Sequence, residues 1–198
     1  MIDLGRVGYA DAHARMVLAV AARIGGEVGD TVLICEHDPV YTVGRRRDAS
    51  ANVLAPGDVP VVEVERGGDV TWHGPGQLVA YPILLLEGDR RDLHAHLHRL
   101  EQVMIDVCGV FGLDAGRDER NTGAWIAGRK VGSVGVACRR WVTWHGLALN
   151  VDPDLAWFAR INPCGFDASV MTSMARERGA SVAFDAVKSE LVARVASW

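Results

Sequence analysis

Three short segments of this chain carry residue types that could act on an acyl group. They read RGGDVTWHGPGQ at 66–77, GRKVGSVG at 128–135 and INPCGF at 161–166. The third segment presents a cysteine, Cys164, between a proline and a glycine. A thiolate is a strong nucleophile, but a free cysteine has a pKa of about 8.5 and needs help to ionise at neutral pH. These residues predict an enzyme that holds an acyl group on Cys164.

Lys130 is the residue best suited to activate this thiol. It is the only lysine before Lys188 in a chain that is otherwise rich in arginine. An ammonium group stabilises a nearby thiolate, whereas a neutral amine takes the proton of the thiol. Burial can tune a lysine in this way but cannot tune an arginine. The residue types alone also allow a plainer interpretation, in which Cys164 packs in a turn and Lys130 is a solvated charge at a strand end.

The first segment gathers several groups that could hold a ligand. Arg66 could fix a polar or charged group, and Gly67 and Gly68 let the backbone approach a ligand closely. In extended backbone Thr71 and His73 share a face, and His73 could orient a carbonyl or carry a proton. The segment is not a phosphate-binding P-loop, since no Gly-Lys-Ser/Thr follows it. The alternative is a glycine-rich hairpin with a structural histidine.

The second segment places glycines at 128, 132 and 135 around Lys130. Small residues there would leave room for a chain-like ligand; the alternative is a tight turn followed by a bulged strand. The pentapeptide VTWHG occurs at 70–74 and again at 142–146. Two strands therefore end in an imidazole followed by a glycine, and both could open onto one pocket; coincidence is the competing explanation.

Other candidates are weaker. Cys35 lies in an apolar strand close to His37 and is kept as an alternative nucleophile without clear access. Three histidines at 94, 96 and 98 resemble a metal cluster, but only the first and third share a helix face and no acidic or thiol partner stands at familiar spacing. We expect them on a solvated face and expect no metal site. The arginines at 45–47, with Arg139 and Arg140, form basic patches that could dock an acidic partner or could be ordinary solvated charge.

Composition limits the class of protein. The chain has 198 residues, 49% hydrophobic content and a formal net charge of −4. These values favour one globular domain spanning 1–198 and give no basic field for nucleic acid. The four cysteines lack CxxC spacing, no secretory signal is evident, and the apolar stretch 16–24 is too short to cross a bilayer. We therefore expect free thiols, no membrane association and a cytoplasmic location.

Periodicity and breaker residues predict the elements that must position these groups. Helices are expected at 9–25, 92–112 and 183–196, with Asp92 as the cap of the second and a short helical turn after Asp152-Pro153-Asp154. Strands are expected at 31–37, 59–65, 78–86, 124–127, 129–137 and 141–150, and a surface loop at 45–60. Pro82 implies an edge strand or a bulge. The order lacks regular βαβ alternation, so we expect an α+β fold.

Together the strings resemble the octanoyltransferases of lipoate biosynthesis, the lipoyl(octanoyl) transferase or lipoate-protein ligase B family. The resemblance covers residues 9–173 and rests on EHDPVYTVGRR at 36–46, RGGDVTWHGPGQLVAYPI at 66–83, GRKVGSVGV at 128–136, VTWHGLALNV at 142–151 and INPCGFDASVMTS at 161–173. Five strings in the right order are specific, whereas one alone would be weak. Trp72 stands where an aromatic such as tyrosine is expected, and it touches no presumed catalytic group.

The resemblance implies a single domain with a mixed β-sheet flanked by helices, similar to biotin and lipoate ligase catalytic domains. It also implies that Cys164 forms the acyl thioester and that Lys130 lowers its pKa. Three segments would bind the acyl group: Arg66, Gly67, Gly68, Asp69, Val70, Thr71, Trp72 and His73; Ser133, Val134 and Gly135; and Gly146, Leu147 and Ala148.

The implied donor is octanoyl-acyl carrier protein. The implied acceptors are specific lysines on the lipoyl domains of 2-oxoacid dehydrogenase E2 subunits and on the glycine-cleavage H protein. Thioester exchange is nearly thermoneutral and transfer to an amide is downhill, so no ATP or other cofactor is expected. Nothing in the sequence demands a dimer, and a monomer is expected. Two alternatives stay open: a lipoate or biotin ligase that uses ATP and needs no cysteine, and a non-catalytic acyl-binding module.

Overall fold

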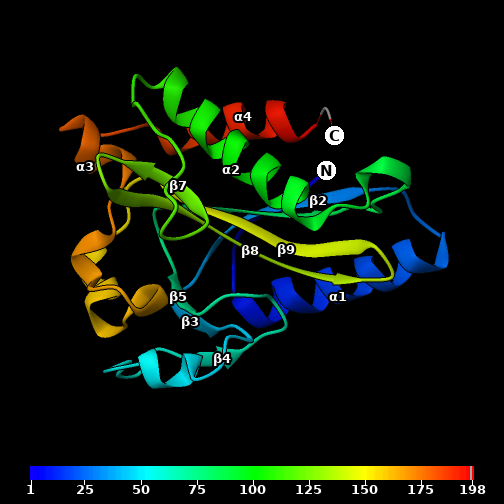
Figure 1. The fold of residues 1–198 in the computed structure, drawn as a ribbon, viewed down its shortest axis with the longest axis horizontal. Coiled ribbons are helices and arrows are strands. Elements are labelled where there is room, and N and C mark those ends of the chain that lie inside the picture. The colour runs from blue at the N-terminus through cyan, green and yellow to red at the C-terminus, as the bar shows by residue number, and fades with distance from the viewer. Residues whose placement is uncertain (197) are drawn as a thin grey trace.

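The centre of the molecule is a six-stranded mixed sheet with the strand order β1-β2-β6-β9-β8-β7 (Figure 1). The structure is a computed structural model that describes residues 1–196 and 198, and the side chain of Cys164 lies outside the described part. The strands are β1 (Ile2–Val7), β2 (Thr31–His37), β6 (Gln77–Ile83), β7 (Gly123–Ile126), β8 (Arg129–Arg139) and β9 (Val142–Asn150). β1 and β2 are parallel, and the other neighbours pair antiparallel.

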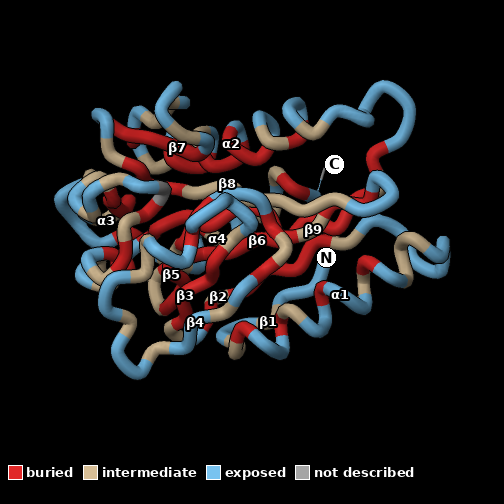
Figure 2. The backbone as a smooth tube through the Cα atoms, turned by 60° about the horizontal axis from the view of Figure 1, so that its bottom comes forward, coloured by how far each residue is buried: buried red, intermediate tan, exposed pale blue. Residues whose placement is uncertain are grey.

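Helices cover both faces of this sheet. α1 (Tyr9–Gly25) lies on one face, and α2 (Leu93–Val110) and α4 (Phe184–Val195) lie on the other (Figure 1). The alternation along β2 follows from this arrangement: Val32 and Ile34 belong to the core under α2 and α4, whereas Leu33 and Cys35 belong to the core under α1. The central strands are accordingly buried along most of their length (Figure 2).

A second sheet of three strands, in the order β4-β3-β5, stands beside the main one (Figure 1). Its strands are β3 (Val40–Val43), β4 (Val61–Glu63) and β5 (Val70–His73), and its own core includes Tyr41, Trp72, Phe158, Ile161 and Met171. The remaining elements are the helix α3 (Met174–Arg178) and the 3-10 turns η1 (Ala49–Asn52), η2 (Gly88–Arg90), η3 (Leu155–Arg160), η4 (Pro163–Gly165) and η5 (Ala168–Val170). The predicted α+β class is confirmed.

The long helices begin and end where their sequences indicate. α1 stops at a left-handed cap, Gly26, with φ of 76°. The Asp92 side chain accepts hydrogen bonds from the backbone N–H groups of His94 and Ala95 at the start of α2, which confirms the predicted cap. Within the described part of the chain, none of the helices is both long enough and apolar enough to cross a bilayer.

Pro82 was predicted at an edge or a bulge; the edge alternative is wrong, because β6 is an inner strand of the sheet. β6 pairs with β2 over Val79–Ile83, and its ladder with β9 covers Gln77–Ala80 and resumes at the bridge between Leu85 and Val142, so Pro82 lies in an interruption of that ladder. Gly146 of β9 makes the approach possible, because a Cβ there would lie 2.6 Å from Cδ of Pro82. The strands β1 and β3 and the short helix α3 were not predicted, since their segments are too short for a clear period.

Candidate functional site

A cavity of about 240 Å³ lies between the two sheets, and nearly every predicted site residue reaches it. Its walls include Lys130 and the following predicted ligand-binding residues: Arg66, Gly67, Gly68, Asp69, Val70, Thr71, His73, Ser133, Val134, Gly135, Gly146, Leu147 and Ala148. These residues come from β5 and the loop before it, from β8 and from β9. Segments that are 60 or more positions apart in the chain therefore share one pocket, as the resemblance implied.

Trp72 does not line the cavity. It alternates with Thr71 and His73 along β5, so its ring enters the core of the small sheet, where it is fully buried. The ring stacks on Trp157 with centroids 6.1 Å apart and meets Phe158 edge-on. Gly74 must follow it, because a Cβ at that position would lie 2.1 Å from the indole. Trp72 thus fixes the strand from behind the pocket.

Several glycines in β8 and β9 allow neighbouring elements to pack closely, because a Cβ at these positions would clash. A Cβ on Gly132 would lie 2.4 Å from Sδ of Met104, so this glycine lets α2 approach β8 on the side away from the cavity. A Cβ on Gly146 would lie 2.3 Å from the Ala80 carbonyl oxygen. Gly135 faces the pocket loop, with Cδ of Arg66 at 3.0 Å from such a Cβ. The prediction that small residues leave room for a ligand fits Gly135 but not Gly132.

Lys130 is buried, with 4% of its surface exposed, and is not the solvated strand-end charge of the alternative interpretation. Its Nζ donates to Oδ1 of Asn121 and lies 5.6 Å from the centre of the Trp125 ring. On its backbone, the Lys130 carbonyl accepts from the N–H of Thr172 at 3.0 Å, which ties β8 to the segment after η5. The amino group of Lys130 is therefore held in a defined place at the cavity wall.

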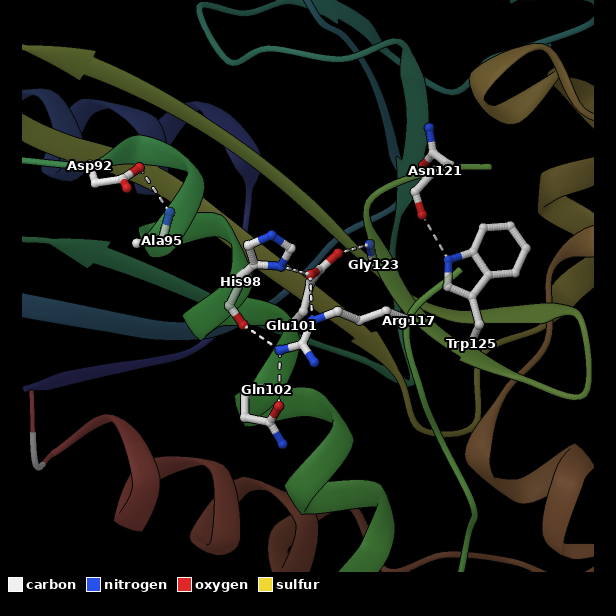
Figure 3. Close-up of polar contacts among 9 residues, drawn as sticks. All are labelled: Asp92, Ala95, His98, Glu101, Gln102, Arg117, Asn121, Gly123 and Trp125. Atoms are coloured by element: carbon white, nitrogen blue, oxygen red, sulfur yellow. Dashed lines mark hydrogen bonds and ion pairs between the residues drawn. The ribbon is translucent and has the colours of Figure 1, made fainter. Parts of the chain in front are cut away.

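Asn121 was not singled out in the sequence, and it is the described side chain that orients Lys130 most directly. It lines the cavity together with Thr122. Its own carbonyl accepts from Nε1 of Trp125 at 2.9 Å (Figure 3). The sequence signal was weak, because RNTGAW resembles many polar turns.

Glu101 of α2 supports the loop that carries Asn121. Its carboxylate is buried and accepts from the backbone N–H of Gly123 at 2.8 Å and from Nε of Arg117 at 3.0 Å (Figure 3). Nδ1 of His98 lies 3.0 Å from the same carboxylate. The Gly123 backbone and the Arg117 side chain, on either side of Asn121, are thereby bound to α2, and the Asn121 side chain in turn fixes the position of Lys130.

Arg66 organises the loop before β5. Its guanidinium donates to the carbonyl and hydroxyl of Thr42 at 2.8 and 2.9 Å and to the carbonyl of Asp69 at 2.9 Å. The Asp69 carboxylate accepts in turn from Nδ2 of Asn52 and from NH1 of Arg46. The described contacts of both residues shape the pocket wall; direct contact with a ligand stays a prediction.

His73 ends β5, but His145 lies inside β9, which continues to Asn150, so the expectation that both VTWHG strands end in an imidazole is wrong for the second. Both histidines line this cavity, which confirms the shared-pocket prediction. Burial, followed by the nearby charge of His37, lowers the pKa of His73 to about 3. Burial, followed by the charge of Arg66, lowers the pKa of His145 to about 4. Nδ1 of His73 lies 2.6 Å from Oε1 of Gln77, so the ring is fixed as a neutral hydrogen-bonding group at neutral pH.

Cys35, the alternative nucleophile, is buried in the core. Burial raises the pKa of Cys35 to about 12, and its Sγ lies 3.4 Å from a His37 ring that also contacts the Tyr81 hydroxyl at 2.7 Å. A thiol so hard to ionise is a poor nucleophile, so the alternative assignment to Cys35 is not supported. The predicted nucleophile Cys164 belongs to η4, its side chain lies outside the described residues, and its neighbour Pro163 lines the cavity.

The histidines of α2 do not share one solvated face, contrary to expectation. His94 is exposed and His98 contacts Glu101, but His96 is 4% exposed. Its ring packs edge-on against Trp198, and neither ring nitrogen has a hydrogen-bond partner among the described residues. The sequence argument considered only a metal face and missed that position 96 points into the packing of α2 against the C-terminal helix.

Comparison with known proteins places the chain in one family. Residues 9–196 match the family model "Lipoyl protein ligase A/B catalytic domain". An octanoyltransferase of Geobacter sulfurreducens is 46% identical over 98% of this chain and 81% of its own length. Among solved structures, a putative lipoate protein ligase from T. acidophilum with bound lipoic acid superposes with a TM-score of 0.74 at 16% identity, covering 99% of this chain and 83% of that one.

The biotin protein ligase from Aquifex aeolicus is more distant, with a TM-score of 0.59 at 11% identity over the whole of this chain and 68% of that one. These two structures show a shared fold: a single α+β domain of the lipoate and biotin ligase type. The sequence relatives show the family of the chain. The chain belongs to the octanoyltransferases of the lipoyl protein ligase A/B catalytic family. It is an acyltransferase of octanoyl groups in protein lipoylation.

Proposed function

We propose that this enzyme takes an octanoyl group from octanoyl-acyl carrier protein onto Cys164 and passes it to a specific lysine of a lipoyl domain. The observation that supports this route most directly is the buried Lys130 in the wall of a cavity that Pro163, the neighbour of Cys164, also lines. A cavity with walls of Val134, Leu147 and Val79 suits a saturated chain.

The first half-reaction forms the acyl-enzyme. Lys130 accepts the thiol proton of Cys164, and the thiolate attacks the carbonyl carbon of the donor thioester. The tetrahedral intermediate collapses by breaking the bond to the carrier sulfur, which leaves with the proton that Lys130 returns. Backbone N–H groups near Cys164 and in the glycine-rich turns are the candidates to stabilise the oxyanion.

The second half-reaction transfers the octanoyl group to the acceptor. The neutral amine of the acceptor lysine attacks the thioester, the bond to Cys164 breaks, and Lys130 takes the proton that the new amide releases. Exchange between thioesters is nearly thermoneutral and amide formation is downhill, so the route needs no ATP and no other cofactor. The ring of His73, neutral and fixed by Gln77, is placed to orient the ligand carbonyl.

The proposed partners follow from the same chemistry. The acceptors are lipoyl domains of 2-oxoacid dehydrogenase E2 subunits and the glycine-cleavage H protein, and the enzyme works as a monomer in the cytoplasm. Arg45 and Arg47 are exposed beside the loop before β5, which lines the pocket, and would receive an acidic carrier protein. Arg139 and Arg140, also exposed, lie at the far end of β8.

A transfer assay with a purified lipoyl domain as acceptor tests this function. The enzyme is given either octanoyl-acyl carrier protein without ATP or octanoate with ATP, as wild type and as Cys164→Ala. Our proposal predicts product only with the carrier thioester and only with the wild type. Product from octanoate and ATP with Cys164 dispensable would show a ligase, and acyl binding without any transfer would show a non-catalytic module.

A further inference from the structure

A second group of polar side chains meets around His145, which lines the cavity and lies on β9 where that strand pairs with β8. His13 of α1 and Glu65 of the loop between β4 and β5 complete it. Nε2 of His13 lies 3.0 Å from Oε2 of Glu65, and Nε2 of His145 lies 3.4 Å from the same oxygen. One ligand atom from each residue lies within 4.8 Å of the others. The octanoyl-transfer route assigns no role to this cluster.

We propose that His13, Glu65 and His145 bind one Zn²⁺ ion. Two imidazole nitrogens and one carboxylate oxygen are the donor set of many three-ligand zinc sites, which leave a fourth position for water or a ligand. Zinc–ligand bonds of about 2.0–2.1 Å in a tetrahedron put ligand atoms roughly 3.3 Å apart. The separations of 3.0 and 3.4 Å from Glu65 lie on either side of this value.

The three ligands are also held and reachable. His145 is 2% exposed and has a left-handed backbone with φ of 56°, uncommon for a residue other than glycine. Its N–H donates to Sδ of Met16 at 3.2 Å, so α1 fixes the backbone of this ligand as well as supplying His13. The Glu65 and His13 side chains are 37% and 27% exposed, which gives an ion access from solvent.

Two features limit the site. Without an ion, hydrogen bonds among the same three groups join α1 to the loop before β5. These hydrogen bonds are a second reason for the three side chains to lie close together. The positive charge of Arg66 acts on His145 and opposes a cation, so the donor set must supply the affinity. Across the described residues, this is the one group of three such side chains that lies close enough to share an ion.

Isothermal titration of the chelator-stripped protein with ZnCl₂ tests the site. The comparison uses His13→Ala, Glu65→Gln and the matched control His94→Ala, which removes an exposed imidazole from α2. Glu65→Gln keeps the shape and hydrogen bonding of the group formed by His13, Glu65 and His145 but replaces the carboxylate ligand. Cys164→Ser is included because a thiol could hold zinc by itself. Circular dichroism and the zinc-free Tm establish that each variant is folded.

The site predicts one equivalent of Zn²⁺ on the wild type, on His94→Ala and on Cys164→Ser, and at least tenfold weaker binding to His13→Ala and Glu65→Gln. Zinc should also raise the Tm of the wild type but not of those two variants. Three results would overturn it: no zinc binding by the wild type, full binding by both ligand variants, or loss of binding in His94→Ala or Cys164→Ser. None of these readouts depends on octanoyl transfer.

Discussion

At the scale of single residues, the site depends on how a lysine is held in a buried place. Lys130 lies at a cavity wall, its Nζ donates to Asn121, and the same Nζ lies over the ring of Trp125. Asn121 does not contact the thioester in the proposed route, so it is a positioning residue. Its effect should therefore appear in turnover more than in binding of the donor.

Replacement of Asn121 tests that position. Asn121→Ala should lower kcat roughly tenfold or more, since a hydrogen bond to a charged group in a buried site is worth about 1.5–3 kcal/mol, while KM for the carrier substrate changes little. Asn121→Asp keeps an acceptor for the ammonium and should recover part of the rate. Steady-state kinetics of both variants, with His94→Ala on the exposed face of α2 as control, measure this. An unchanged kcat for Asn121→Ala would remove Asn121 from the site.

The sequence reveals residues that act through their type more readily than residues that act through their neighbours. Cys164 and Lys130 could be picked out because a thiol on a turn and an isolated lysine are chemically unusual. Asn121 and Glu101 could not, since their importance lies in a contact with a loop or a lysine that the chain order does not reveal. His96 was misjudged for a similar reason, because the helix that buries it comes 88 residues later in the chain.

At the scale of elements, the hairpin of β7 and β8 carries the lysine and leaves no spare room. Gly123 has φ of 148°, and a Cβ there would lie 2.3 Å from the Gly132 carbonyl oxygen and 2.7 Å from Cε of Lys130. The same glycine donates its N–H to Glu101. The pairing of β7 with β8, the position of the Asn121 loop and the placement of Lys130 therefore all depend on the backbone conformation of Gly123.

Gly123→Ala should destabilise the protein and disturb Lys130 together. We expect the free energy of unfolding to fall by about 2 kcal/mol or more, because the conformation disfavours a side chain and the nearest atoms are backbone. Gly116→Ala, in the neighbouring segment where a Cβ would meet nothing within 4 Å, is the matched control and should lie within about 0.5 kcal/mol of wild type. Urea unfolding of both variants measures the difference. Equal stability of the two would contradict the packing described here.

Helices and strands with a clear hydrophobic periodicity could be predicted from the sequence, whereas the elements that each of them packs against or pairs with could not. The helices α1 and α2 and the strands β2, β8 and β9 follow the predicted segments within a few residues. Pro82 shows the limit of the local rule, because an inner strand accommodates a proline where its ladder with the neighbouring strand is interrupted and Gly146 lies beside the ring. The small sheet was harder still, since β3 has four residues and its partners come from two later segments.

At the scale of the whole molecule, burial of titratable groups links stability to pH. Burial, with the charge of Arg99 as the second cause, lowers the pKa of His96 to about 4. The unfolded chain takes up a proton near pH 6.5, whereas the folded chain resists it until about pH 4. The contribution of His96 to stability is therefore fully present above about pH 6.5 and is lost as the pH falls toward 4.

His96→Leu should flatten this dependence. Wild type is expected to lose up to about 3 kcal/mol through this group between about pH 7 and pH 4, and the variant should not lose that part. His94→Leu, at the exposed position two residues earlier, should keep the wild-type slope. Urea unfolding across the pH range measures the three slopes. A slope for His96→Leu equal to that of wild type would show that His96 does not carry the effect.

Charge reversal at the exposed arginines Arg45 and Arg47 tests where the carrier protein docks. Arg47 is 96% exposed in its side chain, and Arg45 is exposed beside it, whereas Arg46 pairs with the buried Asp69 and should be left intact. Arg45→Glu with Arg47→Glu should raise the KM for the acidic carrier several-fold and weaken its salt dependence. Arg178→Glu at the exposed end of α3 is the control. An unchanged salt dependence in the double variant would place docking elsewhere.

The central claim is that the octanoyl group rests on Cys164 between donor and acceptor. Intact-protein mass spectrometry after incubation with octanoyl-acyl carrier protein tests it directly, on wild type and on Cys164→Ala. Our account predicts an added octanoyl group on the wild type alone, and its loss when a lipoyl domain is supplied. An adduct of equal yield on Cys164→Ala, or full transfer by that variant, would contradict the account.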